Sequence, residues 1–121
     1  MSCAETLQTA CETVGLPVFP QVYTGKLKEY IVWNYTVIGA VFAHDVSHAA
    51  RYLIQVHYYL PEKQNPNATL TALCIALEAA GCSCPDITPA SGSYAEGMDR
   101  YGQHFVLECE YADGGVDYGE G

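Results

Sequence analysis

The spacing of apolar residues predicts two helices in this chain. Within residues 2–14, apolar side chains recur every three or four positions, which is typical of one helix face, and Gly15 then suits a C-terminal cap. A second helix is predicted to begin at Pro66, behind Asn65 as N-cap, and to end before Gly81. Its expected buried stripe comprises Leu70, Leu73, Cys74, Leu77 and Ala80.

Strict alternation of apolar and polar residues predicts strands elsewhere. Residues 30–37, 52–60 and 103–111 show this pattern and are rich in Tyr, Val and Ile. Residues 17–23 are extended, since each residue before a proline avoids the α region, and two prolines confine that segment to a sheet edge. Residues 84–91 form a further short strand despite two prolines.

The order of these elements predicts a single α+β domain over residues 1–112. Strands joined by short links are usually antiparallel, so we expect a mostly antiparallel sheet of four to five strands with two helices packed on one face. The other face, rich in Tyr, would be available to a partner. Residues 38–50 are expected to be a less regular connection and residues 91–102 a polar hairpin connection, while residues 113–121 form a flexible, acidic, Gly-rich tail.

The net negative charge of the chain limits the classes of partner that it can bind. The 121 residues carry a net charge of −9, and residues 86–121 hold eight carboxylates against Arg100 alone, a net charge of −7. Such a surface does not hold nucleic-acid phosphates by ion pairing, so no direct sequence-specific nucleic-acid binding is expected. No run approaches the ~20 apolar residues of a membrane span. The first residues lack the pattern of a secretory signal, which predicts free thiols in a reducing compartment.

Two short motifs contain residue types that occur in catalytic sites. His44-Asp45-Val46-Ser47-His48 would place two histidines on one helix face, as in zinc proteases, but Asp replaces the Glu base and no third ligand follows at protease spacing. Glu108 and Glu110 share one strand face and are expected to be solvated rather than an acid–base pair. We therefore expect that the chain has no catalytic residues and that the protein is not an enzyme.

The cysteines offer one alternative function. Cys82-x-Cys84, with Cys74 eight residues earlier, could form a small metal-binding or thiol-redox module, but structural zinc needs a second tight pair. Cys11 and Cys109 lie on apolar faces, and Cys3 is expected to be exposed. The preferred interpretation is therefore buried or free thiols, without a metal or cofactor.

The ordered set of motifs resembles the tail terminator (tail completion) proteins of long-tailed bacteriophages and their prophages. The resemblance covers roughly residues 4–111 and departs at Cys82-Ser83-Cys84 and in the acidic residues after Asp113. The matching stretches are Gly15–Phe19, Tyr30–Tyr35, Val41–Asp45, Tyr52–Val56, Ala80–Cys82 and His104–Phe105.

This resemblance implies a structural virion protein that assembles as a ring, typically a hexamer, at the head-proximal end of the tail tube. The ring would stop tube polymerisation, join the tail to the head connector or stopper protein, and be assembled in the host cytoplasm. A capsid-side neck or connector protein is the alternative implied. Six copies would place about fifty-four negative charges around a pore, which would discourage passing DNA from sticking.

A head-to-tail ring requires two different complementary patches on each subunit. The Tyr-rich sheet and the connection 38–50 are the predicted patches. The candidate interface residues are Tyr30, Trp33, Tyr35, Phe42, His44, Asp45 and Tyr59.

Overall fold

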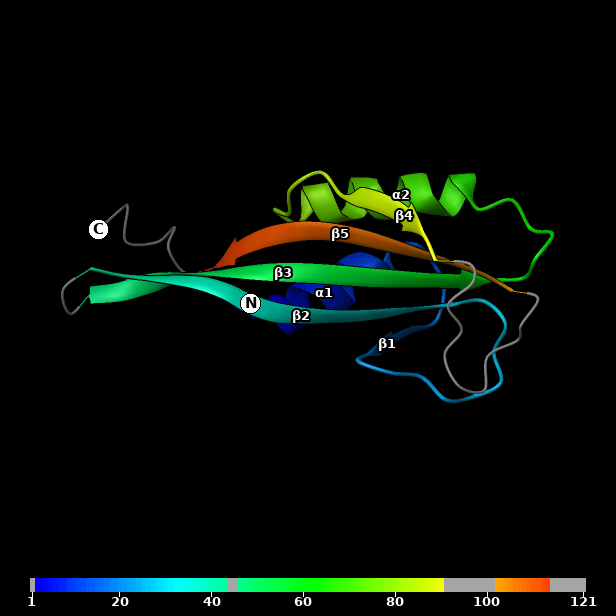
Figure 1. Ribbon diagram of the computed structural model, residues 1–121, viewed down its shortest axis with the longest axis horizontal. Coiled ribbons are helices and arrows are strands. Elements are labelled where there is room, and N and C mark those ends of the chain that lie inside the picture. The colour runs from blue at the N-terminus through cyan, green and yellow to red at the C-terminus, as the bar shows by residue number, and fades with distance from the viewer. Residues whose placement is uncertain (1, 44–45, 91–101, 114–121) are drawn as a thin grey trace.

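The structure is a five-stranded sheet with two helices (Figure 1). The computed structural model describes residues 2–43, 46–90 and 102–113. In chain order the elements are α1 (Cys3–Glu12), β1 (Val18–Pro20), β2 (Tyr30–Ala43), β3 (Val46–Leu60), α2 (Asn67–Ala79), β4 (Asp86–Pro89) and β5 (Gln103–Asp113). The strand order is β1-β2-β3-β5-β4. The predicted α+β class is confirmed, and the sheet is mixed because β1 runs parallel to β2 while the other pairs are antiparallel.

The helix ends follow the predicted capping residues. Ser2 and Glu5 form a capping box, in which the Ser2 Oγ accepts the Glu5 N–H at 3.1 Å and the Glu5 carboxylate accepts the Ser2 N–H at 2.9 Å. Gly15 and Gly81 follow the two helices with φ of 92° and 103°, a conformation that side chains other than glycine rarely adopt. The local sequence therefore determines where both helices stop.

The second helix begins one residue later than predicted. Pro66 is the N-cap rather than the first helical residue, so α2 starts at Asn67. The Asn65 side chain still contributes, since its Oδ1 accepts the backbone N–H of Asn67 at 2.9 Å. The predicted connection 91–102 and tail 113–121 lie largely outside the described residues.

The core lies between the helices and one face of the sheet. Alternate residues of the three central strands point toward α1 and α2, and this set of buried side chains is continuous. Its members with no exposed surface are Leu7, Cys11, Ile31, Ile54, Val56, Tyr58, Leu73, Leu77 and Leu107. No helix within the described residues is both long and apolar enough to cross a membrane.

The predicted irregular connection at residues 38–50 is wrong for most of its length. Residues 38–43 continue β2 and residues 46–50 begin β3, with Ala40 paired to Ala50 and Val41 paired to Ala49. Two register shifts, one between Val37 and Gly39, interrupt the ladder. The bulges and the small residues hide the alternation by which a strand is recognised in sequence, so the pattern predicted a loop.

The extended ends of β2 and β3 form an arm, defined here as residues 37–43 and 46–51. Figure 1 shows this part of the hairpin projecting past α1 and α2, on the side of the molecule opposite the loop that joins β1 to β2. β5 pairs with β3 as far as Ala50, so Asp113 lies beside the arm. The two ends of the sheet thus differ in shape.

Candidate interaction surface

A sharp reversal after β1 brings a loop over the face of the sheet that the helices leave uncovered. Gln21 has φ of 69°, which is rare outside glycine, and its N–H donates to the Trp33 carbonyl at 2.8 Å. The N–H of Val22 donates back to the Pro20 carbonyl at 2.7 Å. The chain therefore turns across the sheet edge immediately after Pro20 and places residues 21–28 beside the uncovered face.

An aromatic row crosses this uncovered face from β1 to β5. It consists of Phe19, Tyr23, Tyr30, Tyr59 and His104. Successive ring centroids lie 4.2 Å apart for Phe19–Tyr23, 4.7 Å for Tyr23–Tyr30, 4.7 Å for Tyr30–Tyr59 and 4.2 Å for Tyr59–His104. The sheet register causes the row, because Tyr30 pairs with Tyr59 and Tyr59 pairs with His104.

Tyr23 holds the loop against the row. Its hydroxyl oxygen accepts the backbone N–H of Leu27 at 3.1 Å, which closes a turn around Gly25. A Cβ atom at Gly25 would collide with the Tyr23 ring, so this close approach requires glycine. The loop conformation therefore depends on a tyrosine and a glycine two residues apart.

A cavity of about 530 Å³ lies between this loop and the sheet. Its lining includes Tyr30, Asn34 and Tyr59 from the sheet, called here the floor, and Lys26 and Lys28 from the loop, called here the rim. These two lysines are the charged residues of the cavity lining, and within the described part of the chain neither forms an ion pair. The cavity is thus an aromatic site with a cationic rim on a chain of net charge −9.

A polar chain runs along the same face beside the cavity. The Asn34 Nδ2 lies 3.3 Å from the His57 Nε2, and the His57 Nδ1 lies 2.9 Å from the His104 Nε2. One imidazole must donate and the other accept at that distance, so both rings cannot be fully protonated in this arrangement. Burial lowers the pKa of His57 from its ordinary value of 6.5, which favours the neutral ring.

The neutral His57 predicts a pH dependence of stability. Because its pKa is lower in the folded protein than in the unfolded chain, its contribution is fully present above pH 6.5 and is lost as pH falls from 6.5 through the folded pKa. We expect the free energy of unfolding, measured by urea titration, to fall over this range. His57→Gln should flatten that decline, and an unchanged profile in this variant would contradict the assignment to His57.

The seven predicted interface residues separate into three places. Tyr30 and Tyr59 stack together in the aromatic row, where Tyr30 is itself 7% exposed and only Tyr59 remains half-buried. Trp33 and Tyr35 point instead toward the helices, and Trp33 is 4% exposed, so burial in the core removes it from the interface candidates.

The remaining candidates concern the arm. Phe42 belongs to β2, near the end of the arm, while His44 and Asp45 lie outside the described residues. Sequence reasoning missed Phe19, Tyr23 and His104, which only the strand register and the loop reversal bring to Tyr30 and Tyr59.

The arm carries exposed apolar side chains. Val37 is 56% exposed and Ile38 is 41% exposed, at the point where the hairpin leaves the helix layer. At the opposite end of the sheet, Val22 and Leu27 are also exposed, beside the cavity. Each end of the sheet thus presents a pair of exposed apolar side chains, called here the two apolar patches, while Ile75 of α2 and Ile87 of β4 are exposed elsewhere.

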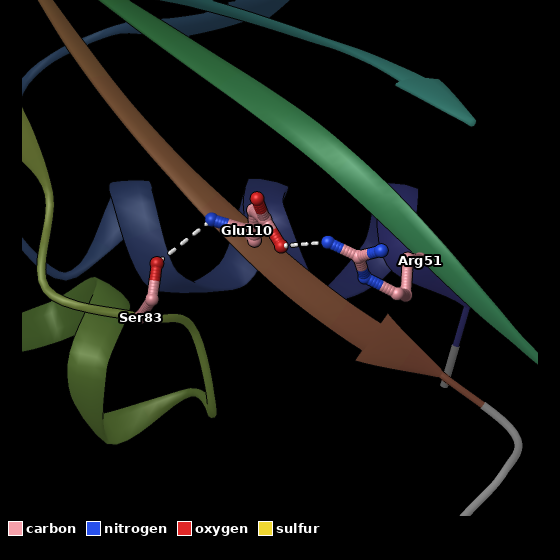
Figure 2. A network of polar contacts seen from close by, with 3 residues as sticks. All are labelled: Arg51, Ser83 and Glu110. Carbon is pink, nitrogen blue, oxygen red and sulfur yellow. Dashed lines mark hydrogen bonds and ion pairs between the residues drawn. The ribbon is translucent and has the colours of Figure 1, made fainter. Parts of the chain in front are cut away.

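A polar network lies at the base of the arm (Figure 2). The Arg51 guanidinium pairs with the Glu110 carboxylate at 2.7 Å, and the Glu110 N–H donates to the Ser83 Oγ at 2.9 Å. The pair is about half exposed and contributes little free energy, but it links β3, β5 and the loop after α2. Glu108 accepts the Gln55 Nε2 at 2.9 Å, so the two glutamates have separate structural partners.

The described residues of the two candidate metal motifs do not form a metal site. His48 lies in β3 and not in a helix, while His44 is outside the described residues. Cys82 is buried and Cys84 exposed, and no cluster of three metal-binding side chains occurs within residues 2–43, 46–90 and 102–113.

The cysteines are mostly core residues. The Cys82 and Cys109 thiols hydrogen bond to each other, and burial raises the pKa of Cys11 to about 12, which keeps that thiol protonated. The prediction that Cys3 is exposed is wrong: it is 3% exposed, because it is the first residue of α1 and packs into the core.

Comparison with known proteins defines the fold but no family. No protein-family model matches the chain, and no curated protein matches it either. Several solved structures are similar, and one of them has a TM-score of 0.51 and 13% sequence identity, over 93% of this chain and 96% of that chain. At this identity the likeness concerns the fold alone, which extends over nearly all of both chains.

Proposed function

We propose that this protein is a structural assembly subunit of the tail terminator type rather than an enzyme. In this proposal copies associate head to tail and close into a ring, with six copies as the expected number. The ring stops polymerisation of the phage tail tube at its head-proximal end and joins the tail to the head connector.

The observation that carries the proposal is the pair of unlike apolar patches at opposite ends of the sheet. Val37 and Ile38 lie on the arm, while Val22 and Leu27 flank the cavity. Exposed apolar patches commonly mark association surfaces. Two different patches on one subunit favour heterologous contacts, which generate a ring when the rotation between neighbours closes.

The charge of the chain supports a structural role near DNA. A net charge of −9 gives a surface that repels phosphates, so a ring of such subunits can let DNA pass without binding it. This charge suits a virion protein at the head–tail junction better than a nucleic-acid-binding module.

Imaging tests the proposal at two levels. Negative-stain micrographs of the purified protein should show rings with a central channel, formed alone or with the tail tube protein. Particles produced without this gene should carry tails of uncontrolled length, since nothing would stop the tube. Tails of normal length that fail to join heads would favour the neck or connector alternative, and normal infectious particles would contradict both.

A further inference from the structure

The cavity under residues 21–28 and the C-terminal residues of the chain have complementary charges, and Asp113, at which those residues begin, lies at the other end of the sheet from the cavity. We propose that the acidic residues 113–121 of one copy dock in this cavity of the next copy, and so act as a connection between neighbouring subunits. The inference rests on the proposed ring and names the contact that holds it together. Asp117, Tyr118 and Glu120 are the docking residues.

The charges of the two partners are complementary. Among the described residues, the cavity lining carries Lys26 and Lys28 and no carboxylate. Residues 113–121 carry Asp113, Asp117 and Glu120 and no basic residue. The chain has three other basic residues. Arg51 pairs with Glu110, Lys63 lies in the turn before α2, and Arg100 is outside the described residues. The cavity is therefore the cationic site that an acidic segment would select.

The cavity floor also suits the composition of the segment. Tyr59 presents aromatic surface, Tyr30 is buried beneath the stacked rings, and the half-buried Asn34 also lines the cavity. Tyr118 stands between Asp117 and Glu120, so an aromatic ring and two carboxylates occur within four residues. Tyrosine stacking on the floor would place the flanking carboxylates near the lysines on the rim.

The segment starts at a different level of the sheet from the cavity. Asp113 pairs with Ala50 of β3, at the arm. The cavity residue nearest to that level is Asn34, which pairs with Gln55, five residues or about 17 Å further along β3 at about 3.3 Å per residue. Residues 114–118 span at most about 18 Å when fully extended. Reaching the cavity of its own copy would therefore require a fully extended segment.

A second copy satisfies the same geometry. The segment starts at the arm, while the cavity lies at the other end of the sheet. A head-to-tail contact brings the arm of one subunit to the cavity end of its neighbour, which also buries the two apolar patches against each other. The acidic segment follows β5, whose end lies beside the arm, so the same contact brings it to the neighbour's cavity.

Charge reversal in the full-length protein tests this docking. Lys26→Glu with Lys28→Glu should weaken self-association about tenfold or more at about 0.1 M salt, and Asp117→Lys with Glu120→Lys should do the same. Combining the four changes should restore association, because the complementary charges are exchanged. Lys63→Glu is the matched control and should have no effect, since Lys63 lies outside the cavity. The differences should shrink at about 1 M salt, where the Debye length is about 3 Å.

Zero-length carbodiimide crosslinking identifies the partner. In a mixture of ¹⁴N- and ¹⁵N-labelled protein, Lys26 or Lys28 should join Asp117 or Glu120 in peptides of mixed isotope. Crosslinks confined to one isotope, or lysine crosslinks to the tube protein instead, would overturn the docking. Rings that persist in all charge-reversed variants would overturn it while leaving the proposed function intact. A wild-type protein that stays monomeric with the tube protein present would overturn both.

Discussion

Trp33→Ala should lower the free energy of unfolding by about 3 to 5 kcal/mol, a large part of the roughly 5 to 15 kcal/mol typical of a domain. The Trp33 side chain is 4% exposed and packs among the buried residues between β2 and the helices. Its removal leaves a cavity that the close-packed core cannot fill. The measurement is chemical denaturation followed by circular dichroism.

A second contribution comes from the indole N–H. It donates to the Gln8 Oε1 at 2.7 Å, and the Gln8 Nε2 donates to the Glu12 carboxylate at 2.8 Å and to the Val18 carbonyl at 3.3 Å. Gln8 of α1 is therefore bonded both to Trp33 of β2 and to Val18 of β1. Trp33→Phe is the control, because it keeps an aromatic ring in the core but loses the hydrogen bond to Gln8. The lost hydrogen bond alone should lower the free energy of unfolding by about 1 kcal/mol. A loss below about 1 kcal/mol for Trp33→Ala would show that the residue is not a core residue.

Val37→Glu with Ile38→Glu should abolish self-association without unfolding the subunit. Both side chains are largely exposed in the protomer, at 56% and 41%, so charges there are tolerated by the isolated fold. In an interface, each would lose about 1.5 to 3 kcal/mol of apolar burial, which corresponds to at least a hundredfold loss of affinity for the pair. Sedimentation velocity measures the association, and circular dichroism verifies the fold.

The matched control for the arm is Ile75→Glu with Ile87→Glu. Ile75 is 64% exposed on α2 and Ile87 is 41% exposed on β4, so the control adds the same two negative charges away from both patches. It should leave the sedimentation coefficient unchanged. Equal loss of association in both variants would indicate a general charge effect, and full association in the arm variant would exclude the arm from the interface.

The sequence predicted the elements whose signals are local. The alternation in residues 52–60 correctly separated Ile54 and Val56 of the core from His57 and Tyr59 of the uncovered face. Gly15 and Gly81, predicted as C-caps, follow the observed C-cap residues Thr13 and Ala80 and have the positive φ that glycine allows. In these cases the preference of each residue and its burial point to the same answer.

Features that depend on distant pairing could not be predicted in this way. β1 and β2 are parallel because residues 21–29 bring the chain back to the level at which β1 begins, along a path that starts with the uncommon positive φ of Gln21. A short link between two strands normally predicts an antiparallel pair. The aromatic row needs the register that aligns Tyr30, Tyr59 and His104. Trp33 was assigned to the interface because one alternating strand does not reveal which of its faces the helices cover.

The central claim is that the subunits close into a ring, and the mass of the wild-type assembly tests it most directly. Native mass spectrometry over a range of concentrations, with and without the tail tube protein, should give one dominant closed species. The expected mass is six times the 13.1 kDa of the chain. A monomer at every concentration, or an open-ended series of masses without a preferred number of copies, would contradict the account.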